Sequence, residues 1–267
     1  MDNRPIGIFD SGLGGLTAVK ALRQLLPEEN LIYFADSGRL PYGGRSRSQL
    51  RRMARQDLDL MASHGVKAVL VACGTVSSNA PDLLEENAIP TFGVMKASVE
   101  AMARMPGTGP LGIIATEATI RSGAFEAALR ELCPDRPIIA LPCPKLVPLI
   151  EFGHIRPDDP LLQEAMDDLA PLRGADALLL GCTHYGIVAE AIRQALGPHT
   201  RLLEASGCGA EALRDYLVRR DLTGGQGQEL FLTSGPAEEF QAAASLFLGR
   251  GRAIAARHIP PMEAGAP

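Results

Sequence analysis

Several features that mark specialised protein classes are missing from this sequence of 267 residues. The first residues, MDNRPIGIFDSG, contain no basic segment followed by an apolar one, so no secretory signal is predicted. No apolar run reaches the roughly 20 residues that a transmembrane helix needs. The formal net charge is -5, which gives no reason to expect a nucleic-acid partner. We therefore expect a cytoplasmic globular protein with neither a membrane nor a nucleic-acid partner.

The cysteines also lack the spacings of common cysteine sites. Their number is odd and no two are spaced as CxxC, so free thiols in a reducing compartment are predicted. Cys182 and His184 stand two residues apart, but two ligands are too few for zinc, and no metal is expected. We interpret Cys133, Cys143 and Cys208 as small apolar core residues. The remaining thiol, Cys73, is considered below together with Cys182.

Short apolar runs alternate with helical patterns along most of the chain. This order predicts right-handed crossovers and mostly parallel sheets, which is the α/β fold class, and the length allows two domains. The segment after Gly249, rich in Ala, Gly and Pro, is expected to be loose. Strands are expected near 5–9, 31–35, 68–72, 91–93, 111–115, 137–141, 175–180, 201–203 and 229–233, and helices near 16–26, 46–64, 98–105, 122–132, 144–152, 161–172, 187–196, 211–219 and 237–248.

An internal repeat links the two halves of the sequence. AVLVACGT at 68–75 matches ALLLGCTH at 177–184, and GIFDSG at 7–12 matches GIIATE at 112–117, with offsets of 109 and 105 residues. Similar offsets indicate two copies of one structural unit. We predict two similar three-layer α/β domains, related by a pseudo-twofold axis, that face each other across a cleft. Ligands of parallel sheets bind beyond the carboxyl ends of the strands, where these four segments end.

Each half of the repeat places one thiol where a predicted strand ends. A helix N-terminus close by stabilises an anion by about 0.3–1 kcal/mol. That is less than the roughly 2 kcal/mol needed to lower a thiol pKa from about 8.5 to about 7. A polar partner must therefore assist each thiol. Thr75 and Asp10 are candidates beside Cys73, and His184 is the candidate beside Cys182.

Two matched thiols suit a reaction that moves a proton across a carbon atom. Removing a proton from one face and returning one to the other requires two acid/base groups, one charged and one neutral. A single nucleophilic cysteine would need no twin. The glycine-rich turn at 9–15 and the PYGG segment at 41–44 offer backbone N–H groups for a carboxylate, and Thr116 and Thr119 add hydroxyls. Thr119 is also expected to cap a helix.

These motifs resemble those of a known enzyme family. FDSGLGG, PYGGRS, ACGT, the Thr116/Thr119 pair and GCTHY occur in the order found in glutamate racemases, of the cofactor-independent aspartate/glutamate racemase superfamily. The resemblance extends from about residue 6 to residue 248. It implies an isomerase that interconverts L- and D-glutamate without pyridoxal phosphate or another cofactor. It also implies a role in peptidoglycan and cell-wall synthesis, a possible homodimer, and domains at 1–96 with 206–267 and at 97–205.

The resemblance also implies a set of site residues. Cys73 and Cys182 correspond to the two catalytic thiols, each serving one enantiomer, and the assisting residues correspond to Asp10, His184 and Glu151. The residues that resemble the substrate-binding set are Ser11, Pro41, Tyr42, Gly43, Gly74, Thr75, Thr116, Thr119 and Thr183.

The sequence departs from the family pattern in three places. Position 74 is Gly where the family more often has Asn, which removes an amide from the substrate site and bears on substrate choice. Gly186 stands where Pro is usual, and 203–206 replaces a segment that usually carries an Asp before a Ser. Two alternatives stay open: a racemase of the same superfamily that acts on aspartate or another amino acid, and a non-catalytic relative that binds an amino acid or a partner.

Overall fold

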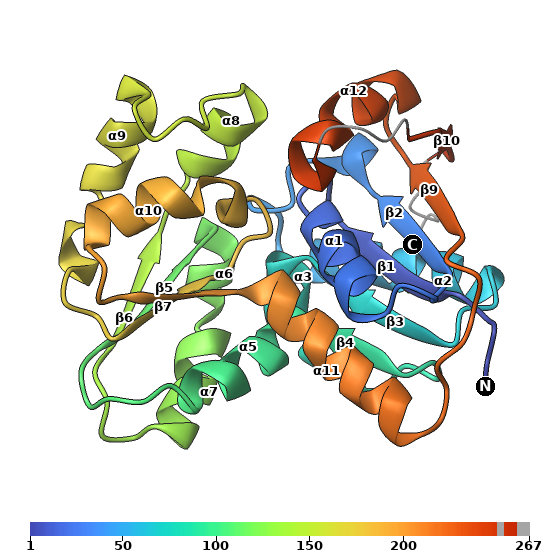
Figure 1. Cartoon of the computed structure of the whole chain (residues 1–267), viewed down its shortest axis with the longest axis horizontal. Helices are drawn as coiled ribbons and strands as arrows, with labels where there is room; N and C mark the ends of the chain where they lie inside the picture. Colours follow the sequence, from blue (N-terminus) through green and yellow to red (C-terminus); the bar gives the residue numbers. More distant parts are fainter. Residues whose placement is uncertain (250–253, 261–267) are drawn as a thin grey trace.

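The computed structural model describes residues 1–249 and 254–260, in which the strands form two sheets that lie side by side (Figure 1). All strand pairs in these residues are parallel. This confirms the predicted α/β fold with two mostly parallel sheets. The six-stranded sheet with its helices is called the first unit below, and the four-stranded sheet with its helices the second unit.

The first sheet has the order β10-β9-β2-β1-β3-β4, and the second has the order β6-β5-β7-β8. The strands of the first are β1 (Ile6–Asp10), β2 (Leu31–Ala35), β3 (Ala68–Val71), β4 (Thr91–Gly93), β9 (Glu229–Thr233) and β10 (Ala256–His258). The strands of the second are β5 (Leu111–Ala115), β6 (Ile138–Pro142), β7 (Ala177–Leu180) and β8 (Arg201–Glu204). In both sheets the two strands of the sequence repeat are direct neighbours, β1 with β3 and β5 with β7.

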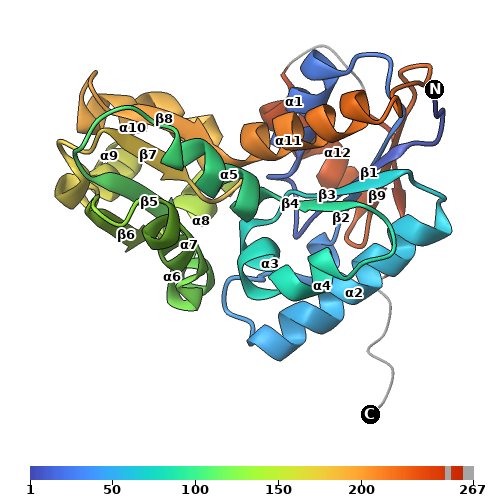
Figure 2. The ribbon, with the colours of Figure 1, turned by 90° about the horizontal axis from the view of Figure 1, so that it is seen from below.

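Helices cover both faces of each sheet because successive residues of a buried strand point to opposite faces. In the second sheet, for example, Ile113 packs in one core and Ile114 in another. Around the first sheet lie α1 (Leu16–Leu25), α11 (Ala205–Arg219) and α12 (Ala237–Leu248) on one face, and α2 (Arg47–Ser63), α3 (Gly74–Asn79) and α4 (Pro81–Glu85) on the other (Figure 2). The other helices are α5 (Val94–Ala103), α6 (Glu117–Ser122), α7 (Ala124–Leu132), α8 (Leu146–Glu151), α9 (Pro160–Asp167) and α10 (Ala189–Leu196), with 3-10 turns η1 (Ser37–Arg39), η2 (Ala170–Leu172) and η3 (Tyr185–Val188).

The chain passes between the two sheets twice. It leaves the first sheet after β4 through α5 and returns after β8 through α11, and these two helices pack against each other (Figure 2). We propose that the domains divide at these helices, as 1–96 with 206–267 and as 97–205. Among the helices of the described segments, none has an apolar stretch long enough for a bilayer.

Several elements differ from the sequence prediction: α4 and α6 form where no helix was expected, α5 begins at Val94 rather than near 98, and three further differences have a clear physical reason. Ala256–His258 forms β10 beside β9 where a loose tail was expected, because the edge of the first sheet offers unpaired backbone groups. The polar stretch after Cys73 forms α3, although Thr and Ser are weak helix formers, because every residue of α3 is buried. Helix α11 begins at Ala205 rather than near 211, since Ala205 and Ser206 are packed inside.

Candidate active site

The two thiols of the repeat occupy equivalent positions in the two units. Cys73 follows β3 and precedes the first residue of α3, while Cys182 follows β7 by two residues and precedes η3. Because β3 and β7 hold the same place in their sheets, both thiols lie at the carboxyl ends of the strands. This is the edge at which parallel sheets bind ligands.

The Cys73 thiol is enclosed on the side of the first unit. Its residue is 4% exposed, and the thiol lies 3.7 Å from the Ser11 hydroxyl, to which it donates a hydrogen bond. Burial, and next the charge of Asp10, raise the pKa of this thiol to about 12. Cys73 is therefore a neutral thiol at neutral pH, which is the state of an acid ready to give a proton.

Asp10 ends β1 with its carboxylate turned into the glycine-rich turn. Its Oδ2 accepts hydrogen bonds from the Gly15 N–H at 2.8 Å and the Gly12 N–H at 3.4 Å. Its Oδ1 is buried without a hydrogen-bond partner, which a buried carboxylate oxygen rarely is. Burial raises the pKa of Asp10, although the nearby His184 opposes the shift. The free oxygen makes Asp10 available to a substrate ammonium group or a transferring proton.

The Cys182 thiol has a cationic partner. The sulfur lies 3.9 Å from His184 Nδ1, and His184 Nε2 lies 3.2 Å from Glu151 Oε1. Burial alone would lower the pKa of His184, but hydrogen bonds to Cys182 and Glu151, with the charges of Cys182 and Asp10, raise it to about 10. The imidazole is therefore protonated at neutral pH, so both ring nitrogens can donate hydrogen bonds, Nδ1 toward the Cys182 sulfur and Nε2 toward Glu151.

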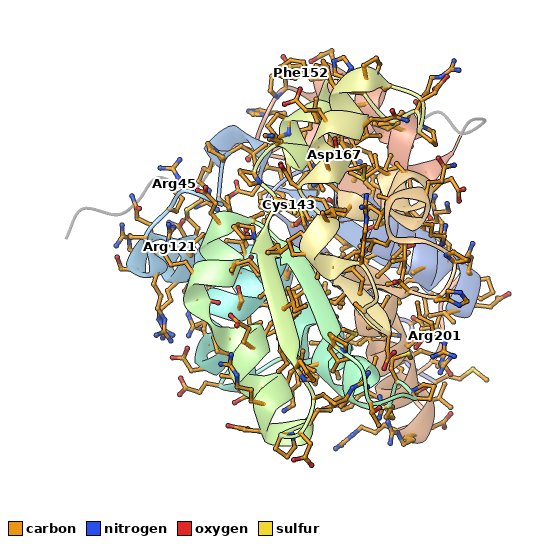
Figure 3. All side chains as sticks on the ribbon, turned by 90° about the vertical axis from the view of Figure 1, so that its left-hand side faces the viewer. Arg45, Arg121, Cys143, Phe152, Asp167 and Arg201 are labelled. Carbon is orange, nitrogen blue, oxygen red and sulfur yellow. The ribbon has the colours of Figure 1, made fainter. Side chains whose placement is uncertain are left out.

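Glu151 reaches this histidine from the end of α8, at the edge of the site. Its carboxylate is 38% exposed, and the adjacent Phe152 is 83% exposed at the outer margin of the second unit (Figure 3). Glu151 is thus connected to Cys182 through His184. Because 31 positions separate Glu151 from Cys182 in the sequence, no local pattern could predict this connection.

Threonine hydroxyls connect the two units close to Cys73. Thr75 Oγ1 lies 3.1 Å from Thr116 Oγ1, and Thr116 Oγ1 lies 2.9 Å from Thr119 Oγ1. Helix α6 is capped by Thr116, whose hydroxyl accepts from the Thr119 N–H, so the expectation that Thr119 is the cap was wrong. The helix begins at Glu117, and a side chain caps only from the position before the first turn. The three hydroxyls form a polar surface that can hold a carboxylate.

The predicted PYGG segment contributes its backbone rather than its phenol. The Tyr42 ring is 2% exposed, and its hydroxyl donates a hydrogen bond to Asp36 inside the first unit. Gly43, by contrast, faces Thr116, since a Cβ atom there would lie 3.6 Å from the Thr116 Cβ. Pro41 is exposed beside them. The buried phenol therefore anchors the segment while Gly43 turns toward the second unit.

The Tyr42 hydroxyl lies beside Asp36 and Asp57, and Arg39 is the cation that binds both carboxylates. Its guanidinium binds Asp36 and lies 2.6 Å from Asp57 Oδ1, and both carboxylates are fully buried. We expect Arg39→Leu to reduce the free energy of unfolding by about 3 kcal/mol, because it leaves two buried carboxylates without a counter-charge. Urea denaturation measures this loss. Arg52→Leu, on the exposed face of α2, is the control, and an equal effect of both substitutions would contradict the prediction.

Sequence reasoning missed the residues of the first unit that surround Thr183 and His184. Thr17 Oγ1 lies 2.8 Å from Ser206 Oγ and 3.5 Å from the Thr183 carbonyl oxygen. The Phe247 ring, from α12, stands edge-on to His184 with 5.6 Å between ring centroids. The glycine-rich turn before Thr17 was a visible signal, and Ser206 belongs to the segment 203–206 that departs from the family pattern, whereas Phe247 belongs to no recognisable motif.

The described residues offer no second site for the chemistry of the two thiols. Within residues 1–249 and 254–260, no three His, Cys, Asp or Glu side chains are grouped as metal ligands would be. A surface groove of about 1240 Å³ runs between α5 and α11, and none of the predicted site residues line it. The polar groups that could perform proton transfer are instead gathered where the two thiol-bearing segments meet.

The fold and the paired thiols can now be compared with known proteins. The profile of the Asp/Glu/Hydantoin racemase family matches residues 17–213. A glutamate racemase from Chlorobaculum tepidum is 38% identical over 253 residues, covering 92% of each chain. The structure of Francisella tularensis glutamate racemase in complex with D-glutamate superposes with a TM-score of 0.88 at 32% identity, covering 97% of this chain and 98% of that one. Thermus thermophilus glutamate racemase, in complex with beta-chloro-D-alanine, gives 0.86 at 38% identity over the same shares.

These similarities define an isomerase built from two parallel α/β units. The chain belongs to the Asp/Glu/hydantoin racemase family. The relatives just described, which it matches over nearly their whole length, are glutamate racemases.

Proposed function

We propose that this protein interconverts L- and D-glutamate by proton transfer between two cysteines. The observation that carries the proposal is the difference between the surroundings of the two thiols. Cys73 is buried and neutral beside Asp10, whereas Cys182 stands beside a protonated His184. A two-base reaction at a carbon needs one charged and one neutral group on opposite faces, and these two thiols supply them. The names of the similar relatives support glutamate as the substrate.

The reaction balances with protein groups alone. The Cys182 thiolate takes the α-proton, and the electron pair of the broken C–H bond stays on the α-carbon. The Cys73 thiol then delivers its proton to the opposite face, which leaves Cys73 as the thiolate and Cys182 as the thiol. The product is the other enantiomer, and the exchanged thiol states suit the reverse reaction. No step requires a cofactor.

The surrounding groups have to stabilise the carbanionic intermediate, which is too basic to persist in water. Backbone N–H groups and hydroxyls aimed at the substrate carboxylate provide that stabilisation without reorganising during the reaction. We assign the binding role to Ser11, Pro41, Tyr42, Gly43, Gly74, Thr75, Thr116, Thr119 and Thr183, with Tyr42 acting through its backbone. Asp10 assists Cys73, and His184 with Glu151 assists Cys182.

The biological role follows from the product. We infer that the enzyme works in the cytoplasm and supplies D-glutamate for peptidoglycan, and hence for the cell wall and cell shape. The small substrate is the only partner that the reaction itself requires.

Solvent isotope exchange tests the reaction directly. We expect the purified protein in deuterated water to incorporate deuterium at the α-carbon of L-glutamate, measured by NMR, while optical activity measured by circular dichroism decays to zero. D-glutamate should give the mirror-image result, because the equilibrium constant between enantiomers is one.

Other outcomes would overturn the proposal in distinct ways. Exchange with aspartate or another amino acid, but not with glutamate, would keep the two-thiol chemistry and reject the substrate. Binding of glutamate without exchange of its α-hydrogen would reject catalysis and favour a non-catalytic binding protein.

A further inference from the structure

Gly74 touches the opposite unit directly beside the two thiols. A Cβ atom built on Gly74 would lie much closer than 3.0 Å to the carbonyl oxygen of Gly181, and real Cβ atoms do not approach other heavy atoms this closely. These two glycines are the sequence neighbours of Cys73 and Cys182. The obstacle is backbone, and the Gly181 N–H is fixed by a 2.8 Å hydrogen bond to Ile114 in the second sheet. A side chain at position 74 therefore cannot be accommodated without separating the two segments.

Gly14 makes a similar close contact with the other end of the same segment. A Cβ atom there would meet the Thr183 hydroxyl and would lie 2.8 Å from His184 Cε1. Neither φ angle lies in the left-handed region, so it is the close approach, and not backbone conformation, that calls for glycine at these two positions. Residues 181–184 are thus approached closely at both ends by residues without side chains.

We propose that Gly14 and Gly74 form a slot that seats residues 181–184 and so sets the position of Cys182 and His184 relative to Cys73 and Asp10. Both glycines are positioning residues. The Thr17 contact with the Thr183 carbonyl closes the slot from the side of α1. The consequence for catalysis rests on the racemase function proposed above, whereas the slot itself does not.

The slot gives a physical meaning to the departure at position 74. An asparagine at this position, the residue more common in the family pattern, would place its Cβ atom against the Gly181 carbonyl oxygen, so the two segments of this chain would have to lie further apart. In this chain the missing side chain removes one amide from the substrate site and lets the segments approach more closely.

Alanine substitution tests the slot while keeping the backbone N–H at each position. We expect Gly74→Ala and Gly14→Ala to lower kcat by at least about 10-fold, with a much smaller change in KM, since a shift of about 1 Å in a reacting group costs up to about 100-fold. Gly207→Ala in α11 is the matched control, because a Cβ atom there meets nothing within 4 Å. That control should keep wild-type kcat.

A second readout needs no substrate. Cys73 is 4% exposed, so alkylation by iodoacetamide should be slow in the wild-type protein. We expect Gly74→Ala to accelerate labelling of Cys73 several-fold, measured by peptide mass spectrometry, because the added methyl opens the contact. Cys133, which is partly buried at the end of α7, serves as the internal reference in every variant.

The two readouts separate the slot from the proposed function. If the wild-type protein does not racemise glutamate but Gly74→Ala still exposes Cys73, the slot stands and the function falls. If Gly74→Ala keeps wild-type kcat and wild-type labelling, the slot is overturned. Should that variant fail to fold, Gly14→Ala decides, because its methyl meets only side-chain atoms.

Discussion

Replacing Cys73 by alanine is expected to abolish racemisation in both directions, with a loss of at least about 1000-fold in kcat. The buried thiol is the proton donor for one face of the α-carbon, and the Ser11 hydroxyl, to which it donates a hydrogen bond, is too weak an acid to replace it. Optical activity of L- and D-glutamate, followed by circular dichroism, measures the loss. The fold should persist, because alanine keeps most of a small apolar side chain.

The substitution should also separate the two half-reactions. With Cys182 and His184 intact, one enantiomer should still exchange its α-hydrogen with deuterated water while its configuration is retained. Cys182→Ala should show exchange with the other enantiomer only. Cys133→Ala is the control for removing a thiol elsewhere. Full racemisation by Cys73→Ala, or exchange with both enantiomers, would contradict the two-thiol assignment.

The second large effect is expected at His184. His184→Asn keeps a hydrogen-bond donor near Cys182 but removes the positive charge, so kcat/KM at neutral pH should fall by about 100-fold or more. In the wild-type protein kcat/KM should also decline as pH rises through about 10, the pKa at which His184 loses its proton. That decline should be absent from the profile of the variant.

Stability provides an independent check of the same charge. The folded-state pKa of His184, about 10, lies above its ordinary value of 6.5. A raised pKa means that the folded state binds the proton more tightly, so this stabilisation is complete below pH 6.5 and is lost as pH rises to about 10. The free energy of unfolding should therefore fall more steeply over this range in the wild-type protein than in His184→Asn. Parallel curves would show that the imidazole is not protonated in the fold.

The sequence determined the fold class and the position of the thiols. Alternating strands and helices are local patterns, and parallel connections of this kind lead to α/β sheets almost without alternative. The repeat then placed Cys73 and Cys182 at equivalent strand ends, where the structure also has them. Chemistry that depends on residue type and on strand ends can be predicted this way, because it needs no knowledge of packing.

Only the tertiary structure decided how the two units meet. Three contacts join residues from separate elements. The Tyr42 hydroxyl binds Asp36, Glu151 contacts His184, and Gly74 lies against Gly181. No periodicity or local motif encodes such contacts, because they depend on how helices and sheets pack side chains from distant parts of the chain. The charge of His184 also depends on the tertiary structure, because burial lowers the pKa of its imidazole and the neighbouring side chains raise it.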